Sequence, residues 1–319
     1  MVIGMKYRIG VDIGGTTIKT GAVDENYKIV QRHVIDTPDT YQKSLQAIAK
    51  EVTDMAEKLQ VSMKDILCVG VGAPGSVVPE TGQLIFANNT DWVNEPMKKD
   101  LQELIEAPVY FGNDANCAII GEAIAGAAKN KKNVLMLTLG TGVGGGIIIG
   151  GKMFSGGNGL GAELGHMPII SGGRLCTCGL HGCLEAYASA PALIAYAKAE
   201  MEKDPSSQLH QWKTENGNID GRAVFECAKA GDIAANKALD IYVSYLADAI
   251  GGYTNIFRPE MVLLGGGLSN AGEFLLSKLE EKIPHYTFAY DLIGGAELAC
   301  AKLGNDAGII GAAYYDTMS

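Results

Sequence analysis

The chain has 319 residues, of which 47% are hydrophobic, and a formal net charge of −10 at pH 7. This length suffices for two domains with substantial cores, and the composition excludes a largely disordered protein. The acidic balance argues against a nucleic-acid partner, although backbone amides can still hold an anionic ligand. No apolar run approaches the roughly 18 residues that cross a bilayer, and no signal peptide is visible, so we expect no membrane association. Seven scattered cysteines are typical of a reducing cytoplasm, which is the expected location.

The first third of the chain predicts strands alternating with helices, and it opens with three strands in a meander. We expect strands at 8–11, 18–23 and 28–34, a helix at 41–59, a strand at 66–72, a loop-rich segment to residue 92, a helix at 97–105 and a strand at 108–111. Glycines occupy the first bend of the meander, directly after Asp12.

Asp114 lies where the strand at 108–111 meets a helix of small apolar residues expected at 117–128. Asp and Asn are preferred as N-caps of helices. The residues alone therefore favour a helix cap at Asp114, with a catalytic carboxylate as the alternative.

The opening architecture then repeats, with a strand at 133–139, a glycine bend at 140–146 and a strand at 147–149. The remaining elements are expected as helices at 191–201, 221–230 and 233–257, a strand at 261–264, a helix at 272–283 and a final helix at 307–315.

Residues 140–145 match the dinucleotide-binding pattern G-x-G-x-x-G, but that pattern requires a helix next and here a strand follows. Residues 146–152 resemble a P-loop, but Met153 stands where Ser or Thr must hold magnesium. What remains is two similar glycine hairpins, 12–17 and 138–146, whose backbone amides suit phosphate oxygens. The alternative is two tight turns without a ligand. Gly265, Gly266 and Gly267, between a strand and a helix, form a third place suited to a nucleotide base or ribose.

The stretch 163–185 holds three cysteines and two histidines, framed by Glu163 and Glu185. Three thiolates and one imidazole complete a tetrahedral structural zinc site. The ligands that the spacing predicts are His166, Cys176, Cys178 and Cys183, with His181 as the alternative to His166. A disulfide or buried free thiols are the other interpretations.

Taken together, these segments resemble the ROK family of sugar kinases and sugar-responsive repressors, and most of all its bacterial glucokinases. The resemblance covers essentially the whole chain. It rests on D-I-G-G-T at 12–16, G-N-D-A-N at 112–116, the glycine run at 139–146, E-L-G-H at 163–166, C-x-C-G-x-x-G-C-x-E at 176–185 and the ending at 303–313.

The resemblance implies an actin-like, ribonuclease H-like α/β fold with two domains around a cleft and a small zinc-knuckle insertion. We expect a smaller domain at 1–116 plus 303–319 and a larger one at 117–302. It also implies ATP with Mg²⁺, and a homodimer or tetramer.

The residue roles follow the same resemblance. Asp114 matches the general base that accepts the proton of the attacking hydroxyl, which reverses the preference for a cap. The hexose would contact Asn89, Asn113, Asp114, Glu163, His166 and Glu185. The nucleotide and its metal would contact Asp12, Gly14, Gly15, Thr16, Thr17, Thr138, Gly140, Thr141, Gly142, Gly265, Gly266 and Gly267, although Asp12 also has a structural interpretation as a satisfied carboxylate at a strand end.

The expected activity is phosphorylation of the 6-OH of glucose. The alternative within the family is a kinase for N-acetylhexosamine, N-acylmannosamine or fructose. A sugar-responsive repressor is less favoured, because the first strand begins by Arg8 and leaves no room for a DNA-binding domain before it.

Overall fold

The computed structural model describes residues 6–87 and 90–318. The chain divides into two compact units. Unit 1 comprises residues 1–132, 146–162 and 302–319, and unit 2 comprises residues 133–145 and 163–301.

The first five-stranded sheet confirms the predicted meander. The first three strands along the chain pair antiparallel with one another, and the other two extend the sheet from the first strand in parallel. The spatial order is β3 (Ile29–Asp36), β2 (Thr17–Val23), β1 (Tyr7–Ile13), β4 (Ile66–Ala73) and β8 (Val109–Asn113).

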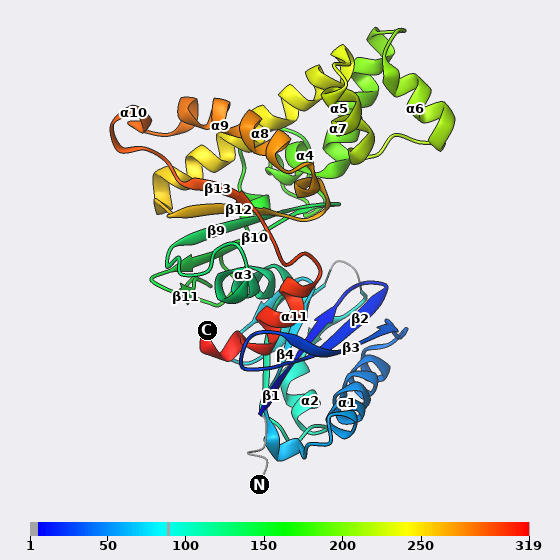
Figure 1. The fold of residues 1–319 in the computed structure, drawn as a ribbon, viewed down its shortest axis with the longest axis vertical. Coiled ribbons are helices and arrows are strands. Elements are labelled where there is room, and N and C mark those ends of the chain that lie inside the picture. The colour runs from blue at the N-terminus through cyan, green and yellow to red at the C-terminus, as the bar shows by residue number, and fades with distance from the viewer. Residues whose placement is uncertain (1–5, 88–89, 319) are drawn as a thin grey trace. The chain divides into compact units, whose positions relative to one another are not determined.

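Successive residues of β1 face opposite sides of this sheet, and each side is covered differently. Ile9 and Val11 join a hydrophobic core with α1 (Tyr41–Lys58) and α2 (Met97–Gln102). Gly10 and Gly70 face α11 (Asp306–Ala313), and a Cβ added at Gly10 would lie 1.9 Å from the Ile309 carbonyl oxygen. The helix α11 also packs against α3 (Asp114–Ala125), so unit 1 has helices on both faces of its sheet (Figure 1).

The segment that was expected to be loop up to residue 92 carries two strands of a small sheet, and the third strand follows it directly. The antiparallel strands of this sheet are β5 (Ser76–Val78), β6 (Gln83–Phe86) and β7 (Val93–Glu95). These strands have only three or four residues each, which is too short for a clear period-2 pattern.

The second five-stranded sheet repeats the order of the first. In space it runs β11 (Lys152–Met153), β10 (Val143–Ile149), β9 (Val134–Leu139), β12 (Met261–Gly265) and β13 (Glu297–Cys300). The expected bend at 140–146 was too long, because β10 already begins at Val143 and three glycines belong to the strand. The duplicated hairpin inferred from the sequence is confirmed.

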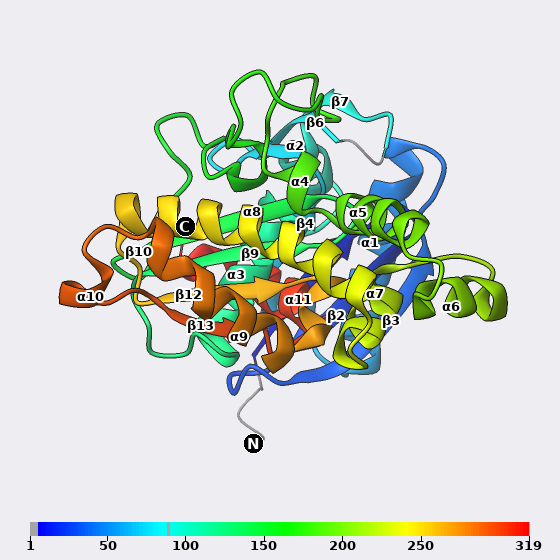
Figure 2. The same ribbon diagram turned by 90° about the horizontal axis from the view of Figure 1, so that it is seen from above.

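Unit 2 is rich in helices, and the long helix α8 (Ile233–Phe257) has the predicted bounds. In Figure 2 α8 is the long yellow helix, with α9 beside it. The other helices are α4 (Glu185–Ala188), α5 (Ala190–Lys203), α6 (Gln208–Asn216), α7 (Gly221–Lys229), α9 (Glu273–Lys282) and α10 (Tyr290–Ile293). Short 3-10 helices cover Met63–Asp65, Leu164–His166, Gly267–Ala271, Ile283–Tyr286 and Tyr315–Thr317.

The compact units differ from the domains expected from the sequence in where α3 falls. Residues 117–132 group with unit 1, because α3 packs tightly on α11, and residues 146–162 join the same unit. Among the described residues, no helix is long and apolar enough to cross a membrane.

Candidate active site and metal centre

A tight hairpin between β1 and β2 carries the predicted phosphate contacts of unit 1. The amide of Gly14 donates to the Thr17 carbonyl over 2.9 Å and closes the turn. Gly15 and Thr16 are exposed at its tip. The turn therefore presents backbone and one hydroxyl to solvent, as a phosphate-binding turn requires.

Asp12 precedes this turn near the end of β1, and it is half-buried. Its carboxylate lies 3.3 Å from Nζ of Lys19, and a Cβ added at Gly308 in α11 would come within 3.2 Å of its Cγ. The carboxylate thus has a cationic partner within unit 1, as its structural interpretation expected. An ion pair with a partly exposed lysine also leaves carboxylate lone pairs for a cation.

The interpretation of Asp114 as a helix cap is wrong, because the cap of α3 is Asn113. Oδ1 of Asn113 accepts from the amides of Ala115 at 2.9 Å and Asn116 at 3.2 Å, while its Nδ2 donates to the Gly75 carbonyl at 2.8 Å. Asp114 is the first residue of α3 and is exposed, and its Oδ1 also accepts from the Ala115 amide, at 2.8 Å. Capping therefore does not by itself account for a carboxylate at this position.

The second hairpin, in unit 2, is hydrogen-bonded to residues 185–190. These residues follow the metal-binding segment 166–183, which is called the knuckle below. The Gly140 amide donates to the Gly142 carbonyl over 3.0 Å, and the Gly140 carbonyl accepts from the Ala190 amide at 2.8 Å. The Val143 amide donates to Oε2 of Glu185 at 3.0 Å. A Cβ added at Gly142 would lie 2.4 Å from that same oxygen, so glycine leaves room for the carboxylate.

The three glycines at the end of β12, Gly265, Gly266 and Gly267, differ in how closely other atoms approach them. Gly266 is required by packing, because an added Cβ would lie 2.4 Å from the Leu139 carbonyl oxygen, whereas one added at Gly265 would meet only the flexible end of the Met136 side chain, at 2.5 Å. Gly266 also has a φ of 79°, which favours glycine. Gly267 is exposed and an added Cβ would meet nothing within 4 Å, so packing gives no reason for glycine at this position.

The knuckle folds through glycines that no other residue can replace without a shift. A Cβ added at Gly182, where φ is 86°, would lie 1.8 Å from the Ile170 carbonyl oxygen. The Cys176 amide donates to the Leu180 carbonyl at 2.8 Å, which closes the turn 176–180 that carries Cys178. Arg174 stacks against Tyr187 and anchors the turn to the body of unit 2.

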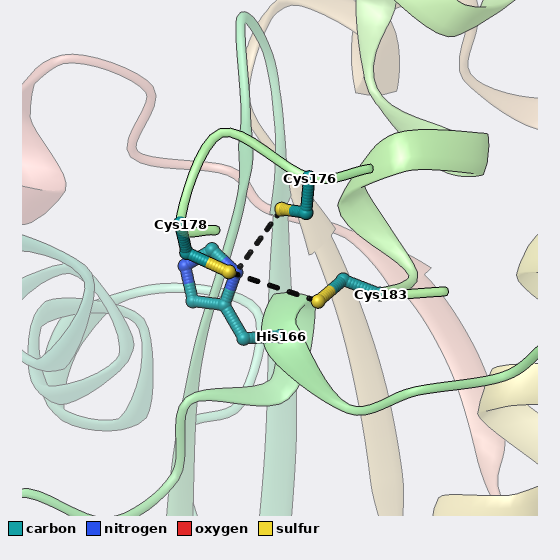
Figure 3. Close-up of side chains that lie close together, drawn as sticks. All are labelled: His166, Cys176, Cys178 and Cys183. Carbon is teal, nitrogen blue, oxygen red and sulfur yellow. Dashed lines mark hydrogen bonds between the residues drawn. The ribbon is translucent and has the colours of Figure 1, made fainter. Parts of the chain in front are cut away.

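One imidazole and three thiols converge at this turn (Figure 3). Their ligand atoms all lie within 4.8 Å of one another, and they belong to His166, Cys176, Cys178 and Cys183. Sγ of Cys178 and Cys183 are 3.8 Å apart, and Sγ of Cys176 is 3.7 Å from Nδ1 of His166. Tetrahedral zinc–sulfur bonds of about 2.3 Å place two sulfurs about 3.8 Å apart, so the set fits zinc.

His181, the alternative ligand, lies elsewhere in the turn, with Nδ1 2.9 Å from the Gly173 carbonyl oxygen. No disulfide joins the described cysteines, all seven of which are free thiols. The grouping of His166 with the three thiols is therefore the arrangement preferred from the sequence.

The three thiols differ in acidity. Burial, followed by hydrogen bonds among the thiols, raises the pKa of Cys183 to about 12, and burial also raises the pKa of Cys176. For Cys178 burial acts to raise the pKa, but hydrogen bonds from the Leu180 amide and the neighbouring thiols outweigh it and lower the pKa. The exposed Cys178 is thus the thiol that deprotonates most readily, as a metal ligand must.

Glu163 and His166 flank one 3-10 turn, and the His166 amide donates to the Glu163 carbonyl at 3.0 Å. The side chain of Glu163 reaches solvent, yet the surrounding protein desolvates it and raises its pKa, while His166 opposes that shift. The buried neighbour Leu164 fixes this turn, because its carbonyl accepts a hydrogen bond from the Tyr253 hydroxyl.

The structure brings some of the predicted residues together, namely His166 with the three cysteines and Glu185 with the hairpin of unit 2. In unit 2, Glu185 joins the hairpin, while Thr138 of β9 pairs in register with Gly265 of β12, and Thr141 is exposed at the hairpin tip. Asn89 lies outside the described residues.

Sequence reasoning missed two groups that hold Glu185, the amide of Val143 and the hydroxyl of Thr177. The only sequence signal for Thr177 is its place inside the C-x-C motif.

Comparison with known proteins assigns the chain to a family. The model of the ROK family matches residues 8–316. The glucokinase of Thermotoga maritima is 37% identical over 308 residues, covering 96% of this chain and 95% of the relative. The chain belongs to the ROK family.

Solved structures agree. A ROK family glucokinase from Streptomyces griseus, in complex with glucose and AMPPNP, is 35% identical with a TM-score of 0.81, covering 97% of this chain and 98% of that one. The ROK hexokinase from Thermus thermophilus is 30% identical with a TM-score of 0.81, covering 98% of this chain and 99% of that one. The expected actin-like α/β fold is confirmed.

Proposed function

We propose that the protein is an ATP-dependent hexose kinase, a glucokinase that transfers the γ-phosphoryl group of ATP to the 6-OH of glucose. Near full-length similarity to a glucokinase, and to a family structure that holds glucose and an ATP analogue, supports this proposal. Phosphoryl transfer needs positioning, charge neutralisation and a group that takes the proton.

The observation that carries the proposal is the setting of Asp114. It is an exposed carboxylate on the first turn of α3, and the capping task there belongs to Asn113. In the proposed mechanism Asp114 accepts the proton of the attacking hydroxyl as the phosphorus–oxygen bond forms. A positioned general base contributes typically about 10²–10⁴-fold to the rate.

The hexose hydroxyls need paired donors and acceptors. Glu163 and Glu185 accept from them, and Nε2 of His166 donates to a sugar oxygen, since Nδ1 faces the thiol cluster. Asn113 and Asn89 complete this proposed set.

The two glycine hairpins are proposed to hold the phosphates of ATP through backbone amides, with threonine hydroxyls as added donors. The residues proposed for this role are Gly14, Gly15, Thr16, Thr17, Thr138, Gly140, Thr141 and Gly142. Asp12 would hold Mg²⁺, which neutralises phosphate charge when bound. Gly265, Gly266 and Gly267 would border the nucleoside, and Gly267 is exposed with no neighbouring atom that would exclude a side chain.

The metal at His166, Cys176, Cys178 and Cys183 is proposed to be structural Zn²⁺. Four protein ligands leave no open coordination position for chemistry. Its task would be to hold the segment that carries Glu163, His166 and Glu185.

The primary test is ADP release with a panel of glucose, mannose, fructose, N-acetylglucosamine and N-acetylmannosamine. We expect the highest kcat/KM with glucose. If no hexose supports ADP release, the kinase assignment is wrong, and a preference for an N-acetylated sugar would move the protein to that branch of the family.

Asp114→Asn is the matched test of mechanism. We expect kcat to fall by at least about 100-fold, with the Kd for glucose within a few-fold of wild type, because the amide keeps the shape but accepts no proton. Asp39→Asn, an exposed carboxylate on a loop of the same unit, should retain wild-type kcat. An unchanged kcat in Asp114→Asn would contradict the role of Asp114 as the general base.

Family analogy further supports a homodimer or tetramer, a cytoplasmic location, and domains at 1–116 plus 303–319 and at 117–302. Sedimentation analysis of the purified protein tests the first of these, and a monomer at all concentrations would contradict it.

A further inference from the structure

Glu185 is gripped by donors from two different segments of unit 2. Its Oε2 accepts from the Val143 amide at 3.0 Å, and its Oε1 accepts from the Thr177 hydroxyl at 2.7 Å. Sγ of Cys176 lies 3.4 Å from Oε1. The two short bonds fall on opposite oxygens, so together they fix the rotation of the carboxylate, which is otherwise a soft torsion.

The hydroxyl of Thr177 is placed by the knuckle itself. Thr177 stands between Cys176 and Cys178, in a turn closed by the Gly179 amide donating to the Cys176 carbonyl at 3.0 Å. The backbone that aims the thiols at one point therefore also aims this hydroxyl at Glu185. Thr177 is exposed, so packing within the core of the unit does not account for its side chain.

This grip leaves acceptor capacity for a ligand. An ionised carboxylate offers about four lone-pair sites, two on each oxygen. Val143 occupies one site on Oε2 and Thr177 one on Oε1, and the Cys176 thiol also donates to Oε1 while it is protonated. One site on Oε2 therefore remains for a hydroxyl donor, and a second one on Oε1 becomes available when the thiol is ionised as a metal ligand. The Thr177 bond thus orients the group without blocking it.

We propose that Thr177 is a positioning residue for the hexose, whose hydroxyl holds Glu185 in the orientation that accepts sugar hydroxyls. The inference rests on the proposed role of Glu185 as a hexose ligand. It adds a specific residue, within the metal-binding turn, through which the knuckle affects the sugar subsite. Thr177 itself acts through Glu185 and makes no contact with the reacting atoms.

Thr177→Val tests the inference, because valine keeps the shape and loses the hydroxyl. We expect both the Kd for glucose, measured by calorimetry without ATP, and the KM for glucose to rise about tenfold. The KM for ATP and kcat should stay within about twofold, since nothing in the phosphate hairpins or at Asp114 changes. Thr177→Ser keeps the hydroxyl and should restore wild-type values for glucose.

The control is Thr214→Val, an exposed threonine on α6 whose hydroxyl bonds the His210 carbonyl, and it should match wild type in every constant. Zinc content, measured in each variant, should be equal. An unchanged glucose Kd in Thr177→Val overturns the inference, as does a Thr177→Ser as impaired as Thr177→Val, or a loss of zinc that accounts for the defect. An inactive wild type that still binds glucose overturns only the proposed function, and one that neither binds nor phosphorylates any hexose overturns both.

Discussion

Glu122, on α3, is a fully buried carboxyl group surrounded by backbone donors. Its Oε1 accepts from the amides of Lys302 at 2.8 Å and Leu303 at 2.7 Å, and its Oε2 accepts from the Ala127 amide at 2.7 Å. Lys302 is the first residue of the segment that returns to unit 1. One side chain thus satisfies the amides where that segment begins, and also the amide beyond the end of its own helix.

We expect Glu122→Gln to lower the free energy of unfolding by about 2 kcal/mol, because its amide nitrogen would face a buried N–H and leave donors without an acceptor. Urea unfolding measures this change. The control is Glu57→Gln, an exposed position on α1, which should stay within about 0.5 kcal/mol of wild type. Equal stability of the two variants would show that the second acceptor oxygen of Glu122 contributes nothing to stability.

At the scale of single residues, the sequence predicted those side chains whose role depends on their neighbours along the chain. Asp114 was placed at the junction of a strand and a helix, but the choice between Asp114 and Asn113 as the cap depends on the φ and ψ angles of adjacent residues. Two of the three partners of Glu122, the amides of Lys302 and Leu303, lie about 180 positions along the chain, and no pattern near Glu122 could reveal them.

The knuckle is the element with the clearest chemical signature, and its thiols differ in access. Cys178 is exposed, whereas Cys176 and Cys183 are buried. In metal-free protein we therefore expect iodoacetamide to modify Cys178 first, at least about tenfold faster than the other two thiols of the set, because a buried thiol is less accessible and its thiolate is less populated.

Adding one equivalent of Zn²⁺ should suppress that modification, because a coordinated thiolate is a poor nucleophile. Peptide mapping by mass spectrometry identifies the modified residue. Cys68, buried in unit 1 with its pKa raised to about 11 mainly by burial, serves as the internal control and should stay unmodified in both states. Equal labelling of Cys178 with and without zinc would contradict the proposed metal site.

Among the elements, predictability followed length and locality. The helix α8 has 25 residues and a sustained period, so its bounds were right, and all four knuckle residues fall within one short stretch. The three strands of the β5–β6–β7 sheet were missed because they are short, and because Pro79 and Gly82 between the first two are typical of a loop. The helix α6 was missed because it is largely polar and buries only Leu209.

In the whole molecule, the repeated sheet order is the feature that the sequence predicted only as two similar hairpins. Strand pairing across long separations, such as β1 with β4, is set by tertiary packing and leaves no local pattern. The return of α11 to unit 1 came from family resemblance, and the structure supplies its physical basis. Small residues let α11 approach α3 closely. A Cβ added at Gly311 would lie 1.6 Å from the carbonyl oxygen of Cys117 on α3.

Gly311→Ala should therefore lower the free energy of unfolding of unit 1 and leave that of unit 2 unchanged. We expect unit 1 to lose about 3 kcal/mol or more through this backbone clash, while unit 2 keeps its stability. Hydrogen exchange measures both, as lost protection in β1 and β4 and retained protection in β9 and β12. The control is Gly252→Ala in α8, where an added Cβ meets nothing within 4 Å, and it should stabilise its helix by about 0.5–1 kcal/mol.

The discontinuity of unit 1 also sets an order of events during translation. Every residue of unit 2 has been synthesised by position 301, whereas unit 1 still lacks residues 302–319 at that moment. Until α11 leaves the ribosome, the face of the first sheet lined by Gly10 and Gly70 has no cover, although most of that sheet was made first. The strands β1 and β4 must therefore wait for α11, which is synthesised more than 230 residues later.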